Sequence, residues 1–210
     1  VPSSIETGFA LPPVEEFEKL ITDRTKAILI CNPNNPTGYL YTRSEMNQIR
    51  DIVKKHDLYL FSDEVYREFI YTGSPYISAC HLEGIEQNVV LIDSVSKRYS
   101  ECGIRIGALV TKNAELRKTV MKFCQARLSP PLIGQLVAEA SIEDTEEYSA
   151  EVYEEYVARR KCLVDGLNKI STINPKDTRL EAENYKKLIV SYSRDPRVTV
   201  LKIADRLEVM

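Results

Sequence analysis

The sequence predicts an α/β fold with a mainly parallel β-sheet and flanking helices. Four short apolar runs have the length and composition of strands: residues 26–31, 58–62, 88–93 and 104–111. Stretches with helical spacing lie before the first run, between the first and second, and after the fourth. Strands that alternate with helical connections are typical of a parallel sheet in a βαβ arrangement.

Two helices are expected early in the chain. Residues 14–21 place apolar side chains at helical spacing, namely Val14, Phe17, Leu20 and Ile21. Thr42 and Glu45 have the spacing of a capping box, in which each side chain satisfies a free amide. The helix that they open is predicted to reach about His56. Its apolar face is interpreted as core packing: Met46, Ile49, Ile52 and Val53.

Three more helices are expected after the last strand. The first runs from a cap at Asn113 to about Leu128, before Pro130 and Pro131. The others are predicted over residues 132–141 and 146–170. Residues 171–210 have a different pattern, with a possible strand at 188–192 and a helix that starts near Pro196.

Composition excludes several classes of function. The chain has 210 residues, enough for a domain with a real core, and a net charge of −3. This charge gives no reason to expect nucleic acid or an anionic membrane as a partner. No apolar run approaches the roughly 18 residues that a membrane span needs. The five cysteines are scattered and odd in number, which suggests neither a disulfide framework nor a zinc site and favours a reducing, cytoplasmic setting.

The segment most informative about chemistry is residues 94–107, between the third and fourth strands. Lys97 follows the hydroxyl residues Ser94 and Ser96, and Arg105 stands eight positions later between two glycines, Gly103 and Gly107. A lysine at a strand end is well placed as a nucleophile, and hydroxyls with an arginine can bind phosphate. The alternative interpretation is a turn that carries solvated charges.

Two further polar turns follow predicted strands. Residues 32–38 read Asn-Pro-Asn-Asn-Pro-Thr-Gly, and residues 63–66 read Asp-Glu-Val-Tyr. Ligands of open α/β sheets bind outside the carboxyl ends of strands, where both turns lie. An ordinary turn for the first stretch and a capping role for Asp63 are the structural alternatives.

These three motifs, in this order and at this spacing, resemble the signatures of class I/II aminotransferases of fold type I. The resemblance covers roughly residues 1–170 and implies the cofactor pyridoxal 5′-phosphate (PLP). It implies that Lys97 forms a Schiff base with the cofactor and then moves the substrate's Cα proton. Asp63 would pair with the pyridinium nitrogen and keep it protonated, a role for which Glu64 competes on chemistry alone.

The resemblance also assigns the remaining cofactor contacts. Asn35 and Tyr66 would donate hydrogen bonds to the phenolate oxygen, and the bond between Asn35 and Pro36 is expected to be cis. The phosphate would be bound by Ser94, Arg105 and Ser96. Gly103 and Gly107 would allow close backbone packing nearby. The catalytic set is therefore Lys97, Asp63 and Tyr66, with no metal.

Domain organisation follows from the same resemblance. Residues 1–170 are expected to form part of a PLP-binding large domain, and residues 171–210 a poorly matching tail that starts a small domain. Neither Arg194 nor Arg197 has the local sequence of the family's carboxylate-binding arginine. Family members begin upstream of residue 1, with a phosphate-cradling turn and a ring-stacking aromatic, so the chain is expected to be partial and inactive alone.

The predicted activity is amino transfer between an α-amino acid, aspartate by general similarity, and a 2-oxo acid, in a homodimer. One alternative is a PLP-dependent lyase or synthase of the same fold. Another is a non-catalytic PLP-fold module or an inactive fragment. The presence of Asp63 argues against a module that only binds, because binding alone does not need a partner for the ring nitrogen.

Overall fold

The computed structural model describes residues 1–143 and 146–171. The chain divides into two compact units, residues 1–153 and 154–210. The sheet and its surrounding helices all belong to the first unit. The strand expected at 188–192, the helix near Pro196 and the two tail arginines lie outside the described residues.

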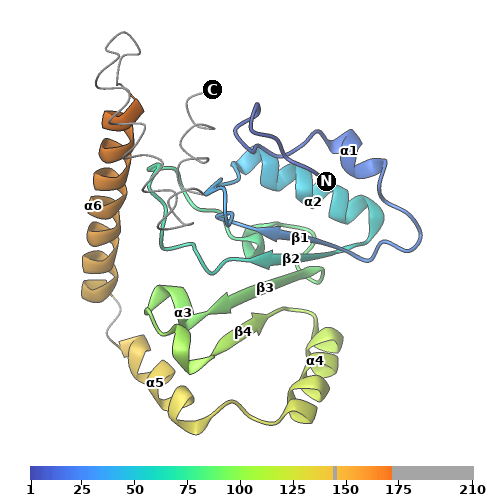
Figure 1. Ribbon diagram of the computed structural model, residues 1–210. Coiled ribbons are helices and arrows are strands. Elements are labelled where there is room, and N and C mark those ends of the chain that lie inside the picture. The colour runs from blue at the N-terminus through green and yellow to red at the C-terminus, as the bar shows by residue number, and fades with distance from the viewer. Residues whose placement is uncertain (144–145, 172–210) are drawn as a thin grey trace, which may run out of the picture. The chain divides into compact units, whose positions relative to one another are not determined.

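A four-stranded mixed sheet forms the centre of the first unit (Figure 1). Its strands lie in sequence order: β1 (Ala27–Cys31), β2 (Tyr59–Asp63), β3 (Val89–Ser94) and β4 (Gly107–Val110). The first three are parallel, which confirms the predicted α/β class with a mainly parallel sheet.

The fourth strand runs antiparallel to β3 and is shorter than residues 104–111. Between the two strands lie only a one-turn helix, α3 (Val95–Arg98), and a 3₁₀ turn, η2 (Cys102–Ile104). Because this connection folds back at the strand end instead of crossing the sheet, it reverses the chain direction. The fold-back places Ser94 opposite Gly107 in the ladder.

Helix α2 (Arg43–His56) covers one face of the sheet. Its predicted apolar face is buried in full, with Met46, Ile49 and Val53 at 0% exposure and Ile52 at 2%. Both halves of the predicted capping box are present between Thr42 and Glu45. Met46, Ile49 and Val53 pack with Leu60, Val89 and apolar residues of the 77–85 segment into the core cluster, which holds β2 and β3 in place.

The face of the sheet opposite α2 is open at β1, and β4 is exposed on both faces. Leu29 of β1 is 71% exposed although its neighbour Ile30 is buried, and all four residues of β4 are exposed. The sequence predicts that residues 26–31 form a buried strand. Among the described residues, this prediction is wrong for the face of β1 that carries Leu29. Alternate side chains of a strand point to opposite faces, and only one face is covered here.

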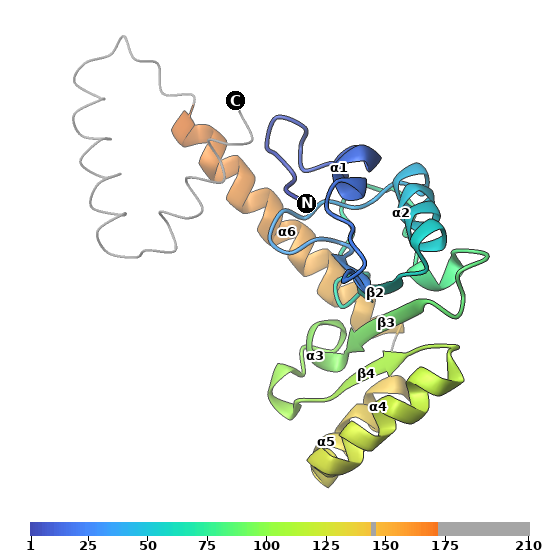
Figure 2. The same cartoon turned by 90° about the vertical axis from the view of Figure 1, so that its right-hand side faces the viewer.

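The remaining four helices in the described part of the chain are all predicted from the sequence, but some of their ends differ from the predicted ones. Helix α1 (Val14–Glu18) stops before the expected residue 21, and α4 (Ala114–Arg127) begins at the predicted Asn113 cap. Helices α5 (Leu132–Glu143) and α6 (Glu146–Ser171) follow. Figures 1 and 2 show α4 and α5 on the β4 side of the sheet. Among the described helices, none is both long and apolar enough to cross a membrane.

Candidate active site

The three motifs meet at one edge of the sheet. The ladder pairs Cys31 with Asp63 and Asp63 with Ile92, so the carboxyl ends of β1, β2 and β3 are level. Residues 32–38, residues 63–66 and α3 each begin at one of these ends (Figure 1). The edge therefore presents side chains from all three motifs, as ligand sites of open α/β sheets require.

The 32–38 turn is held by a buried asparagine at its start. Asn32 is 0% exposed. Its Oδ1 accepts a hydrogen bond from the Tyr41 amide at 3.0 Å, and its Nδ2 donates to the Ile77 carbonyl at 3.5 Å. The peptide bond between Asn35 and Pro36 is cis, as the resemblance implies, and the one between Asn32 and Pro33 is also cis. Asn35 is left exposed beyond the end of the strand.

Asn35, Tyr66 and Lys97 come together although they are far apart in sequence. Asn35 Nδ2 donates a hydrogen bond to Tyr66 Oη at 3.1 Å. The Lys97 Nζ lies 5.8 Å from the centroid of the Tyr66 ring, which is cation–π range. Two hydrogen-bonding groups and one amine are thus close together, as the binding of a small polar ligand at Lys97 requires.

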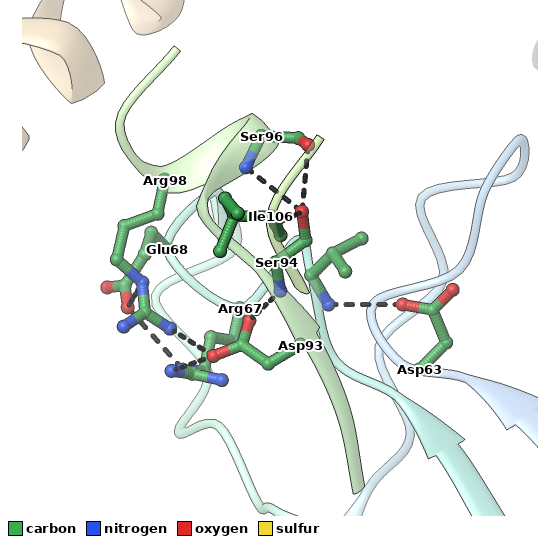
Figure 3. Close-up of polar contacts among 9 residues, drawn as sticks. Asp63, Arg67, Glu68, Asp93, Ser94, Ser96, Arg98 and Ile106 are labelled. Atoms are coloured by element: carbon green, nitrogen blue, oxygen red, sulfur yellow. Dashed lines mark hydrogen bonds and ion pairs between the residues drawn. The ribbon is translucent and has the colours of Figure 1, made fainter. Parts of the chain in front are cut away.

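Asp63 ends β2 next to this group. Its Oδ1 accepts a hydrogen bond from the Val65 amide at 3.2 Å, so it does serve as the local cap considered from the sequence (Figure 3). In the described chain its Oδ2 accepts no hydrogen bond, which leaves that oxygen for a ligand. The neighbouring Glu64 is fully buried and accepts from Ser62 Oγ and the Ala79 amide. Glu64 therefore faces the core and does not compete with Asp63.

Lys97 lies on α3, whose four residues are capped by Ser94. The Ser94 Oγ accepts from the Ser96 amide at 3.1 Å and lies 2.8 Å from Ser96 Oγ. It also lies 3.0 Å from the Ile106 carbonyl, to which it can donate (Figure 3). The two predicted phosphate-binding hydroxyls are thus adjacent, while the Lys97 side chain is exposed.

Arg105 lies in the fold-back between η2 and β4. It has a left-handed backbone (φ 59°), and its Nη1 donates to the Cys102 carbonyl at 2.8 Å. Ion pairs among the described residues do not include Arg105, whose guanidinium is exposed. Its charge is therefore available to an anion near the start of β4.

The two glycines of this segment differ. A Cβ at Gly107 would lie 3.1 Å from the Asp93 carbonyl oxygen, so the expected close approach is present there. No atom of the described chain lies within 4 Å of a Cβ at Gly103, and the close packing expected at that position is not found.

Cys31 also stands at this edge, at the end of β1. Its Sγ donates to the Pro33 carbonyl at 3.3 Å. Burial raises the pKa of the Cys31 thiol above 9.0, and the nearby Asp63 carboxylate adds to the effect. The thiol is therefore protonated near neutral pH and does not rival Lys97 as a nucleophile.

Sequence reasoning missed an ion-pair network under the site, formed by Arg67, Glu68, Asp93 and Arg98 (Figure 3). The Asp93 Oδ2 lies 2.8 Å from Arg67 Nη2 and 3.1 Å from Arg98 Nη2. The available signal was position, because each arginine directly follows a predicted site residue, Tyr66 or Lys97.

The donor set fits PLP. Lys97 offers an exposed amine, and Asn35 and Tyr66 offer donors for a phenolate beside it. Asp63 offers a carboxylate oxygen for a ring nitrogen, and the two serines with Arg105 offer hydroxyls and a cation for a phosphate. The chain thus contains a binding group for each functional group of the cofactor.

Comparison with known proteins points to one family. The sequence model of the family "Aminotransferase class I and II" matches residues 12–193. The aromatic-amino-acid aminotransferase 2 of Thermococcus litoralis is 30% identical over 208 residues, which cover 92% of this chain and 53% of that protein. The aspartate aminotransferase of Pyrococcus abyssi is 32% identical over 84% of this chain and 46% of its own length.

Solved structures give the same result. The aromatic aminotransferase of Pyrococcus horikoshii superposes with a TM-score of 0.70 at 32% identity, over 81% of this chain and 46% of that one. The aspartate aminotransferase of Thermotoga maritima gives 0.73 at 28% identity, over 80% and 44% of the two chains. The chain spans about half the length of the relatives it matches.

Proposed function

This chain belongs to the class I and II aminotransferases, and from that premise we propose that the protein carrying it transfers an amino group between an α-amino acid and a 2-oxo acid, with PLP held on Lys97. The observation that supports this most is the meeting of Asn35, Tyr66 and Lys97, at 3.1 Å and 5.8 Å. These contacts bring together, from three separate segments of the chain, an amine and two hydrogen-bonding side chains of the kind that the cofactor needs.

Lys97 has the central role in this proposal. When bound, PLP supplies an electron sink for the negative charge that develops at the substrate Cα. The Lys97 amine would hold the cofactor covalently and would act as general base and acid for the proton at the substrate Cα. An arginine could not do so, because its guanidinium does not deprotonate in a protein.

The other site residues bind and orient. The Asp63 carboxylate would bind the ring nitrogen of PLP and would favour its protonated form, since a close opposite charge stabilises a cation. Asn35 Nδ2 and Tyr66 Oη donate to the phenolate oxygen. Ser94, Ser96 and Arg105 bind the phosphate and thereby fix the cofactor's orientation relative to Lys97.

Product analysis tests the proposed reaction. The complete gene product carrying this sequence is loaded with PLP and mixed with aspartate and 2-oxoglutarate. The proposal predicts oxaloacetate and glutamate in equal amounts, without ammonia. Ammonia with a cleaved carbon skeleton would instead identify a lyase of the same fold. PLP binding without product from aspartate, alanine or aromatic amino acids would identify a non-catalytic module.

Substrate, assembly and location are part of the same proposal. Aspartate is the first candidate substrate because relatives such as that of Pyrococcus abyssi bear the name aspartate aminotransferase. The proposed homodimer rests on resemblance to the family. All five cysteines are free thiols, which supports a reducing, cytoplasmic setting.

A further inference from the structure

The ion-pair network under the site connects its two most important segments. Asp93 is on β3, immediately before the segment that carries Lys97, and it pairs with two arginines from different parts of the chain. Arg67 directly follows Tyr66, and Arg98 directly follows Lys97. One carboxylate oxygen therefore holds the neighbours of both residues (Figure 3).

Asp93 also fixes the start of the lysine segment. Its second oxygen, Oδ1, accepts a hydrogen bond from the Ser94 amide at 2.8 Å. Ser94 in turn caps α3. Both oxygens of Asp93 are thus engaged, one before α3 and the other with its last residue, Arg98.

Helix α3 needs such support. It has four residues, and a single turn does not form stably alone because nucleation is costly. The location of the Lys97 backbone is consequently set by contacts at the two ends of α3. The bond from Ser94 to Asp93 holds the first end, and the pair of Arg98 with Asp93 holds the last.

Glu68 completes the charge balance. Its Oε1 lies 3.2 Å from Arg98 Nε and 3.5 Å from Arg67 Nε, in ion-pair contacts. The Arg98 Nε makes no hydrogen bond, so this contact is less well directed than those to Asp93. The side chains of Arg67, Asp93 and Arg98 are only 20–23% exposed, so solvent screens their interaction less than that of surface pairs.

Resting on the proposed function, we propose that Asp93 is a positioning residue that sets the spacing between Lys97 and Tyr66. Through Arg98 and Ser94 it fixes α3, and through Arg67 it fixes the turn that carries Tyr66. Its loss leaves the chemical groups of the site intact and misplaces them relative to one another.

The variant Asp93→Asn isolates this role. The asparagine carbonyl can still accept from the Ser94 amide, while its NH₂ group faces two guanidinium groups that it cannot bind. The matched control is Glu18→Gln. Glu18, at the end of α1 and away from the site, also contacts two basic side chains, Lys55 at 3.0 Å and His56 at 2.8 Å, both on α2. Both changes remove one carboxylate that bridges two basic side chains.

The experiment measures three quantities in the complete gene product: the PLP dissociation constant, the share of borohydride-trapped pyridoxyl label on Lys97, and the unfolding temperature without cofactor. We expect Asp93→Asn to weaken PLP binding at least tenfold and to lower the labelled share of Lys97. Glu18→Gln should change the unfolding temperature by a similar amount and leave PLP binding within twofold. If Asp93 had a purely structural role, PLP binding would weaken only in proportion to the loss in unfolding temperature, and it would do so in both variants.

Arg98→Lys is the second variant, in case Asp93→Asn does not fold. The lysine keeps the positive charge but lacks the planar guanidinium that contacts both Asp93 and Glu68. We therefore expect at least threefold weaker PLP binding. Unchanged PLP binding in either folded variant, or equal weakening in Glu18→Gln, would overturn the inference. If the wild-type protein itself is not labelled at Lys97, the proposed function and this inference are both overturned. Wild-type labelling with an unaffected Asp93→Asn variant overturns only the inference.

Discussion

Asn35 Nδ2 donates a hydrogen bond to Tyr66 Oη at 3.1 Å, although 31 residues separate them. One residue follows β1 and the other follows β2, and the parallel register of these strands brings them together. This contact orients the tyrosine hydroxyl, and the Lys97 amine lies 5.8 Å from the centroid of the same tyrosine ring. The proposed activity depends on that arrangement, and the following predictions test its parts.

The first prediction concerns the two adjacent acids. Asp63→Asn should lower kcat of the complete gene product by orders of magnitude, because the ring nitrogen loses its charged partner. Its stability should change little, since the asparagine carbonyl can still accept from the Val65 amide. Steady-state kinetics and urea unfolding measure the two effects.

Glu64→Gln is the matched control and should behave in the opposite way. Glu64 is fully buried and accepts from Ser62 Oγ and the Ala79 amide. Oε1 accepts both bonds, so a glutamine carbonyl can keep them, but the NH₂ group would replace Oε2, which is buried without a hydrogen-bond partner. Burying this donor unsatisfied should cost about 1–3 kcal/mol of unfolding free energy, with a smaller effect on kcat. Near-normal turnover of Asp63→Asn would show that Asp63 is only a cap.

The site residues themselves could be predicted from local sequence, whereas most of the contacts around them could not. Lys97, Asp63, Tyr66 and Asn35 could be assigned because each lies in a short motif at the end of a strand. The ion pair between Asp93 and Arg67 could not be predicted, because the two residues are 26 positions apart and their contact depends on how two strands align. The direction of β4 depended on a fold-back that hydrophobic periodicity does not show. The exposed Leu29 was missed because an apolar run does not reveal which face of a strand is covered.

The second prediction concerns the close approach at Gly107. Gly107→Ala should destabilise the protein by about 1–3 kcal/mol, since its Cβ would press on the Asp93 carbonyl at 3.1 Å. Gly103→Ala, in the same segment, should change stability by less than about 0.5 kcal/mol because the space there is open. Urea unfolding of both variants compares them directly, and equal effects would contradict the described packing of β3 against β4.

The third prediction concerns pH and Glu45. Burial raises the pKa of Glu45, but hydrogen bonds from the Thr42 amide, the Leu11 amide, Thr42 Oγ1 and Tyr39 Oη outweigh it and hold this pKa below 4.5. A folded-state pKa below the unfolded value gives stability that is present above pH 4.5 and lost as pH falls through the folded-state pKa.

Glu45→Gln should therefore cost about 1 kcal/mol at pH 7, and the difference from wild type should shrink on acidification below pH 4.5. Glu15→Gln, on the exposed surface of α1, serves as the control and should show no such trend. The measurement is urea unfolding at several pH values. A cost for Glu45→Gln that stays constant with pH would show that its charge does not matter.

The fourth prediction is that the 210-residue chain alone binds PLP weakly and shows no measurable amino transfer. Its relatives are about twice as long, and the resemblance places part of the phosphate cradle and a ring-stacking aromatic outside the matched segment. Losing positioning groups lowers rates steeply. A coupled assay with aspartate, alanine and aromatic amino acids, each against 2-oxoglutarate, measures it, and clear turnover would show that the chain supplies these groups itself.

The role of Lys97 is the central claim, and covalent trapping tests it most directly. The complete gene product is incubated with PLP, reduced with borohydride, digested and mapped by mass spectrometry. The account predicts one pyridoxyl group per chain, on the peptide that contains Lys97, and none in Lys97→Ala. A label spread over surface lysines such as Lys19 and Lys118, unchanged in Lys97→Ala, would contradict it.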